Sequence, residues 1–143
     1  MDGREYPARP LVGIGCILFR GQDLLLVRRG RPPRQGEWSI PGGAQHLGET
    51  AEAAARRELA EETGVTAGPL SLAAVVDAVS HDDTGRIRFH YTIIDFCGLW
   101  TGGEPRAGDD VTEAAFFAPD ALPPLWHEAV RVIAEARLRL GLG

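Results

Sequence analysis

The segment Thr50–Thr63 constrains the fold of this chain more than any other, because it carries a full set of helix signals. Thr50 can cap the first turn, Glu52 places an acid where the helix dipole favours it, and Gly64 allows a left-handed exit. The interior is rich in alanine, which has the highest intrinsic helix propensity. The sequence therefore predicts a helix with defined ends, against which the rest of the chain must pack.

Three glutamates lie on one side of this predicted helix. At about 100° per residue, Glu61 and Glu62 fall within about 60° of Glu58. The apolar stripe of the helix consists of Ala51, Ala55 and Leu59. A solvated charged face would lie opposite that stripe, whereas Glu62 projects into it. Like charges at the edge of a buried face are costly unless they are neutralised, and divalent cations with oxygen ligands, such as Mg²⁺ or Mn²⁺, are the simplest neutraliser.

Three further features converge on the same place. Arg57 lies four residues before Glu61 and can hold its carboxylate in one rotamer. Gly42 and Gly43 let the chain bend sharply and expose backbone carbonyls, and Glu49 stands just before the helix. We therefore expect several acids and a free carbonyl to meet at one spot.

The rest of the chain is rich in predicted strands. They are expected at Leu11–Phe19, Leu24–Arg28, Trp38–Ile40, Leu70–Ser80, Arg86–Gly98 and Glu113–Phe117. The first two form a hairpin, and Pro41-Gly42-Gly43 ends the third. Gly102–Asp110 is a glycine-rich acidic loop, and Leu125–Leu140 has the apolar spacing of a second helix. This order predicts one α/β domain over residues 1–143, with a mixed β-sheet between helices.

The stretch Gly43–Val65 resembles the Nudix box. That box is a Gly, five residues, a Glu, seven residues, then Arg-Glu, an aliphatic, any residue, Glu-Glu, any residue, Gly and an aliphatic. Every fixed position is filled at the right spacing, by Gly43, Glu49, Arg57-Glu58-Leu59, Glu61-Glu62, Gly64 and Val65. His46 is a departure, since many members carry Glu there. We favour an exposed loop residue over a metal ligand at that position.

The resemblance implies the Nudix fold, an α/β/α sandwich, and hydrolysis of a nucleoside diphosphate linked to another group. It implies Mg²⁺ as the cofactor, which Mn²⁺ can replace. The implied metal ligands are Glu58 and Glu62, supported by Glu61 and the Gly42 carbonyl. The general base of family members is either a box glutamate or an acid from a later loop, for which Asp109, Asp110 and Glu113 are the candidates. We take Glu58, Glu61, Arg57 and Asp110 as the catalytic candidates.

The substrate signals are fewer. Arg28, Trp38 and Gly43 are the candidate substrate-binding residues, although a solvated charge for Arg28 and a core position for Trp38 are equally favoured. The run Val27–Pro33 resembles short bacterial proteins of the ADP-ribose pyrophosphatase kind, which favours ADP-ribose or a nucleoside diphosphate sugar. The alternatives are a (deoxy)nucleoside triphosphate pyrophosphohydrolase and a non-catalytic Nudix-fold nucleotide sensor. Sensors usually lose box carboxylates, and this chain retains them all.

Composition narrows the partners. The 143 residues carry a net charge of −5 at pH 7, which argues against nucleic-acid binding because that needs a basic face. No signal peptide and no apolar run of the roughly 20 residues that span a membrane are visible, so we expect a cytoplasmic protein. Cys16 and Cys97 lie in apolar runs and are expected to be free thiols. The apolar run Ile93–Phe96 or the final helix is the expected contact of a homodimer.

Overall fold

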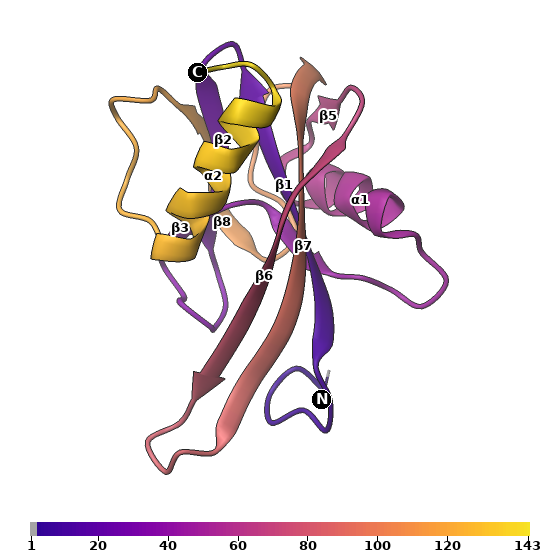
Figure 1. The fold of residues 1–143 in the computed structure, drawn as a ribbon, viewed down its shortest axis with the longest axis vertical. Helices are drawn as coiled ribbons and strands as arrows, with labels where there is room; N and C mark the ends of the chain where they lie inside the picture. Colours follow the sequence, from indigo (N-terminus) through magenta and orange to yellow (C-terminus); the bar gives the residue numbers. More distant parts are fainter. Residues whose placement is uncertain (1–2) are drawn as a thin grey trace.

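The computed structural model describes residues 3–143, which form a sheet with one helix against each face (Figure 1). The elements in chain order are β1 (Leu11–Arg20), β2 (Asp23–Arg29), β3 (Trp38–Ser39), β4 (Gly42–Ala44), α1 (Ala51–Thr63), β5 (Thr66–Ala67), β6 (Ser71–His81), β7 (Ile87–Gly102), β8 (Val111–Phe117) and α2 (His127–Arg139). The sheet order is β3-β2-β1-β7-β5, with β4 on β1, β6 on β7 and β8 on β2. Only β1 and β7 run parallel among these paired strands. The predicted α/β/α sandwich with a mixed sheet is confirmed.

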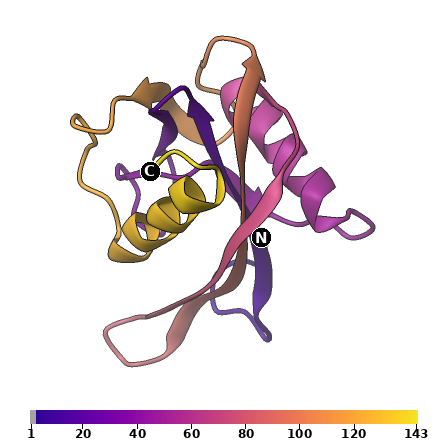
Figure 2. The same cartoon turned by 45° about the horizontal axis from the view of Figure 1, so that its top comes forward.

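Strand β1 is the centre of the core because both of its faces are covered. Ile17 and Phe19 pack on the side of α2, and Cys16 and Leu18 pack on the side of α1. Successive side chains of a strand point to opposite faces, so a strand buried on both sides reads as a continuous apolar run. Figure 2 shows the two helices on either side of the sheet. Strand β1 therefore fixes the distance between the two helix layers.

The predicted hairpin of β1 and β2 is confirmed, with Phe19 opposite Leu24. The glycine turn after β3 was expected to end a strand and is instead strand β4, which pairs with β1. Gly42 makes that pairing possible, because a Cβ there would overlap the carbonyl oxygen of Ile14. Strand β7 runs on to Gly102, four residues past its predicted end, because β5 pairs with that extension.

The second helix begins at His127 rather than at Leu125. Trp126 precedes it with an extended backbone (ψ 138°), and its side chain packs against the core from that position. The run Ile93–Phe96 lies inside β7, between β1 and β6, so its backbone is already paired within the sheet. A dimer contact at this run would have to use its side chains, and the contact expected there or at the final helix stays a prediction.

Both cysteines are free and buried, as predicted. Cys97 packs on the side of α2 and Cys16 on the side of α1, so the sheet separates their thiols. Burial raises the pKa of Cys16 to about 12 and keeps its thiol uncharged.

Among the described residues, neither helix has the length or apolarity needed to cross a membrane.

Candidate metal centre

Helix α1 carries the candidate centre, and its ends are the predicted ones. The Thr50 hydroxyl oxygen accepts a hydrogen bond from the Ala53 backbone N–H at 3.1 Å. Gly64 ends the helix in the left-handed conformation with φ 72°, and its N–H donates to the carbonyl of Ala60. These caps satisfy terminal backbone groups and fix which residues of the helix face the sheet.

Two glutamates of α1 are buried although they are ionisable. Glu58 is 7% exposed and Glu62 is 6% exposed, close to the 2% of their neighbour Leu59. The prediction that Glu62 lies within the apolar side of the helix is confirmed. Burial of a carboxylate without a compensating cation is unfavourable. These two positions therefore need a positive charge nearby.

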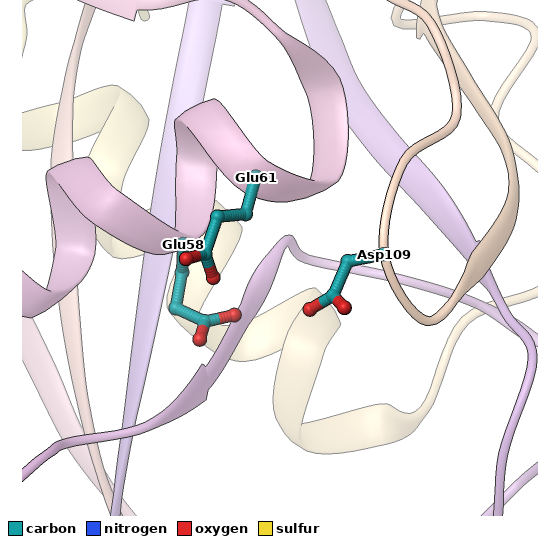
Figure 3. A group of neighbouring side chains, drawn as sticks. All are labelled: Glu58, Glu61 and Asp109. Carbon is teal, nitrogen blue, oxygen red and sulfur yellow. The ribbon is translucent and has the colours of Figure 1, made fainter.

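A third carboxylate reaches the helix from a distant segment. Ligand oxygens of Glu58, Glu61 and Asp109 lie within 4.8 Å of one another. Figure 3 shows Glu58 and Glu61 on the helix and Asp109 facing them from the loop opposite. Three carboxylate oxygens from two elements form an all-oxygen donor set, which suits a hard cation such as Mg²⁺ with water or substrate oxygens in its other positions.

Asp109 is held in place by the C-terminal end of α1. The backbone N–H of Arg106 donates to the Thr63 carbonyl at 3.0 Å, and that of Gly108 donates to the Glu62 carbonyl at 3.1 Å. The loop thus satisfies two carbonyls that the helix itself leaves unpaired. Gly108 must be glycine for this approach, because a Cβ would overlap the carbonyl oxygen of Glu61.

The carboxylate of Glu62 turns toward β4. The backbone N–H of Gly42 donates to its Oε1 at 2.9 Å. Burial raises the pKa of Glu62 to about 8, and the nearby charge of Glu58 adds to this rise, whereas the Gly42 hydrogen bond opposes it. Burial also raises the pKa of Glu58. Gly42 therefore contacts the centre through its N–H.

Gly43 is required by the same packing. A Cβ at Gly43 would overlap the carboxylate of Glu58. Gly43 is a candidate for substrate binding, and the structure places it against Glu58, a candidate metal ligand. Strand β4 and helix α1 are thereby brought close enough for both buried glutamates to lie beside the backbone of β4.

Arg57 binds three carboxylates, where the sequence predicted one. Its guanidinium donates to Glu58 at 2.6 Å, to Glu61 at 2.9 Å and to both oxygens of Glu49. A further N–H donates to the Ala44 carbonyl at 3.0 Å. The Arg57 hydrogen bonds are the main cause of the low pKa of Glu49, about 2. Arg57 therefore sets the rotamers of Glu58 and Glu61 together.

The structure separates the three later acids. Asp109 joins the glutamates, Asp110 forms an ion pair with Arg31 at 2.8 Å, and Glu113 forms one with Arg28 at 3.0 Å. The sequence favours Asp110 as the catalytic acid of this loop. The structure places Asp109, the residue before it, beside Glu58 and Glu61. The backbone of Asp109 has φ 50°, a conformation that Asp tolerates better than most residues, and this turn points the two side chains to different places.

The candidate substrate residues on β2 and β3 have protein partners. Arg28 donates to the Gly36 carbonyl at 2.8 Å as well as to Glu113. Trp38 is half-buried and packs edge-on against Phe117, with ring centroids 4.8 Å apart. The core position considered for Trp38 is therefore its observed one.

Two other residues complete the surroundings. The charge of Arg29 acts on Glu62, and the Nε of Arg29 donates to the Pro33 carbonyl at 2.6 Å. Strand alternation was the signal for it, because Arg29 shares the face of Val27 and Arg28 takes the opposite one. His46 is exposed, with its ring 3.9 Å from Glu49, as expected for a loop residue.

Comparison with known proteins gives consistent matches over most of the chain. Residues 9–136 match the family model described as the NUDIX domain. An ADP-ribose pyrophosphatase of Methanocaldococcus jannaschii is 35% identical over 126 residues, which cover 88% of this chain and 72% of that protein. A Mycobacterium tuberculosis protein named "Putative 8-oxo-dGTP diphosphatase 2" is 39% identical over 120 residues, 79% of this chain and 80% of that one.

The solved structures agree with the sequence matches. A MutT NUDIX hydrolase from Burkholderia pseudomallei superposes with a TM-score of 0.78 at 32% identity. The superposition covers 89% of this chain and 98% of that protein. The similarity therefore extends over the whole sandwich, including both helix layers.

Proposed function

The chain belongs to the Nudix hydrolase family, and on that premise we propose that it is a Mg²⁺-dependent pyrophosphohydrolase of a nucleoside diphosphate linked to another group. The observation that carries this proposal is the meeting of Glu58, Glu61 and Asp109 within 4.8 Å, beside the buried Glu62. Arg57 offsets part of the negative charge of Glu58 and Glu61, and a bound cation would offset the repulsion that remains among the four acids. Catalysis, rather than sensing, is favoured because all the box carboxylates are present.

The proposed metal ligands are Glu58, Glu61 and Glu62, with the Gly42 carbonyl, and Asp109 faces them from the loop before β8. When bound, Mg²⁺ (or Mn²⁺) would screen the pyrophosphate charge and lower the pKa of the attacking water. Arg57 is a positioning residue, because it holds Glu58 and Glu61 in the orientations that face Asp109.

We assign proton acceptance from the attacking water to Asp109 rather than to Asp110. Asp109 is the acid that faces the helical glutamates from a separate element, so it can approach the water from the far side (Figure 3). The Arg31 ion pair holds the Asp110 carboxylate in another direction. Asp109→Asn should therefore reduce kcat more than Asp110→Asn does, and equal losses in the two variants would contradict the assignment.

The substrate we favour is ADP-ribose or a related nucleoside diphosphate sugar. Support comes from the similarity to the Methanocaldococcus jannaschii protein named ADP-ribose pyrophosphatase. The second candidate is an oxidised or normal (deoxy)nucleoside triphosphate, which the name of the Mycobacterium tuberculosis relative favours. Both candidate substrates are small-molecule nucleotides. On either proposal the protein acts in the cytoplasm and does not bind nucleic acid.

The deciding experiment is a substrate panel with Mg²⁺, in which a coupled phosphatase releases phosphate from the products. ADP-ribose and nucleoside diphosphate sugars should be turned over with a higher kcat/KM than 8-oxo-dGTP and the normal triphosphates. Glu62→Gln should abolish the signal, and Glu52→Gln, an exposed change on the same helix, should leave it. A folded sample that hydrolyses no nucleotide of the panel would refute the enzyme proposal.

A further inference from the structure

Strand β6 leaves one edge of the sheet open. It pairs with β7 along one side, and no other described strand pairs with its second side. Helix α2 covers one face of β6, where Val76 joins the core. Figures 1 and 2 show the β6–β7 ribbon running on past the ends of both helices. The backbone N–H and C=O groups on the second side of β6 are therefore available to a strand of another chain.

The other face of β6 alternates valine with ionisable side chains, and all of them are exposed. In order they are Val75, Asp77, Val79 and His81. Val75 is 52% exposed and Val79 is 44% exposed, whereas Val76, which points to the opposite face, is 3% exposed. Within residues 3–143, the side chains of Asp77 and His81 have no hydrogen-bond or ion-pair partner. This face thus presents both apolar and polar groups that the chain itself leaves without contacts.

We propose that β6 pairs antiparallel with β6 of a second copy of this chain, so that the sheet continues across a two-fold axis. The axis makes every contact reciprocal, so the strand must be complementary to itself when it is read in reverse. The alternation of an acid, a valine and a histidine at Asp77, Val79 and His81 meets this condition. A second copy is therefore the occupant that the charges favour. The pairing does not depend on the function proposed above.

The charges also select the register. When Val79 lies opposite Val79 of the partner, Asp77 of each protomer lies opposite His81 of the other. The imidazole can then donate to the carboxylate at two symmetric positions, and cross-strand pairs of this kind stabilise a sheet. Ala78 lies opposite Ser80 on the other face, and both side chains are small enough for paired strands to approach.

Two neighbouring registers are less favourable. Centring the pair on Asp77 would place two carboxylates directly opposite each other, which is destabilising. Centring it on Val75 would include the irregularity between Leu72 and Ala74, where the ladder of β6 is already shifted. The register with Val79 on the axis is therefore the one we test.

The paired stretch is short, so the dimer should be weak. Specific interfaces bury roughly 1,200–2,000 Å² in total, and weaker ones fall below that range. The contact of Asp77–His81 with its copy belongs to the weaker class, for which we expect a Kd on the order of 10–100 μM. Dilute protein is then monomeric, and concentrated protein is dimeric.

The first experiment is sedimentation velocity of the full chain from about 1 μM to about 500 μM, a range that brackets this Kd. The sedimentation coefficient should rise from that of a monomer to that of a dimer. Val79→Arg places two like charges on the axis and should weaken association at least ten-fold. Leu138→Arg is the matched control, because Leu138 is 71% exposed on α2, and it should associate like the unchanged protein.

Three results would overturn the proposal. The unchanged protein could stay monomeric over the whole range, or Val79→Arg could associate as strongly as the unchanged protein. An equal loss in Leu138→Arg and Val79→Arg would also contradict it, because the contact would then involve the final helix.

The second experiment tests the register by cross-linking. Val79→Cys should bring two thiols together at the axis, with Cα atoms about 5 Å apart, which is within the range of a disulfide. Both native cysteines are buried and do not compete. The two copies of Val75→Cys would lie about 26 Å apart, at about 3.3 Å per residue. A mild thiol oxidant should therefore link Val79→Cys and not Val75→Cys, and an equal yield in the two variants would refute the register.

The third experiment exchanges the charges. His81→Asp places a second carboxylate opposite Asp77 at two symmetric positions and should weaken association about ten-fold. The double variant Asp77→His/His81→Asp again places an acid opposite a histidine, so its Kd should return to within about three-fold of that of the unchanged protein. A double variant that associates as weakly as His81→Asp would show that these two side chains do not meet.

Discussion

At the scale of single residues, Arg57 has the largest influence on the centre. One planar guanidinium bonds to Glu49, Glu58 and Glu61 and to the backbone of β4. Lysine has a single ammonium group on a flexible chain and cannot hold these groups in one plane. Arg57→Lys should therefore lower kcat by about 10- to 100-fold at saturating Mg²⁺, the usual cost of losing a group that orients metal ligands.

The control for this change is Arg56→Lys. Arg56 lies on the same helix, but its guanidinium binds Glu52 and the carbonyls of Ala67 and Gly68, away from the acids. Steady-state rates and thermal unfolding of both variants are the measurements. A kcat for Arg57→Lys equal to that of Arg56→Lys would show that Arg57 does not position the ligands.

Asp95 makes the stability of the fold depend on pH. It is 5% exposed, and burial raises its pKa from 3.8 to about 6. The folded state therefore holds a proton between those values that the unfolded state has lost, so stability falls as pH rises from about 4 to 6. Asp95→Asn removes a buried charge at neutral pH and should raise the free energy of unfolding at pH 7 by about 1–3 kcal/mol.

Urea unfolding of the metal-free protein at pH 4 and pH 7 measures this effect. The stability gain of Asp95→Asn should be present at pH 7 and small at pH 4. Asp77→Asn, an exposed change on β6, is the control and should show no such difference. A gain of equal size at both pH values would contradict the role given to burial.

At the scale of elements, the loop before β8 decides where Asp109 lies. Gly108→Ala places a Cβ on the carbonyl oxygen of Glu61, so the loop must move away from the end of α1. We expect Gly108→Ala to lower kcat at least ten-fold while circular dichroism keeps the helix and strand content. Gly68→Ala, where a Cβ meets the Thr101 side chain and the Leu99 carbonyl oxygen at ordinary contact distances, is the control. Full activity in Gly108→Ala would mean that the position of Asp109 does not matter.

The elements also show how far local sequence signals reach. The ends of α1 were predictable because Thr50 and Gly64 act on backbone groups within one turn. Strand β4 was not predictable, because two adjacent glycines are typical of a turn. Gly42 and Gly43 form a strand because their backbone pairs with β1, which is distant in the sequence. Asp109 was one of two adjacent acids, and the choice between them depends on a backbone φ of 50° set by the contact with α1.

At the scale of the whole molecule, the buried acids couple metal binding to stability. Glu58 and Glu62 are buried carboxylates whose mutual repulsion a cation would relieve. A ligand at 100 times its Kd stabilises the folded state by about 2.7 kcal/mol. Mg²⁺ should therefore raise Tm by several degrees, and a chelator should reverse the rise.

Differential scanning calorimetry with increasing Mg²⁺ tests this coupling. Glu62→Gln should reduce the shift, whereas Glu52→Gln, which changes an exposed glutamate, should keep it. A shift that is equal in Glu62→Gln and the unchanged protein would place the cation elsewhere. The positions of the glutamates along α1 made this coupling predictable. The sequence did not reveal that the loop before β8 brings Asp109 to the end of the helix.

The parallel pairing of β1 with β7 has a consequence for folding kinetics. Leu11 pairs with Tyr91 and Phe19 with Leu99, so about eighty intervening residues form a closed loop before the central strands meet. Closing long loops slows folding, because their entropy is lost before the contacts form. Asp109 lies beyond that loop. During synthesis the helical glutamates leave the ribosome first, and a nascent chain completes the group of four acids only after Asp109, which lies in the final third of the protein, has followed.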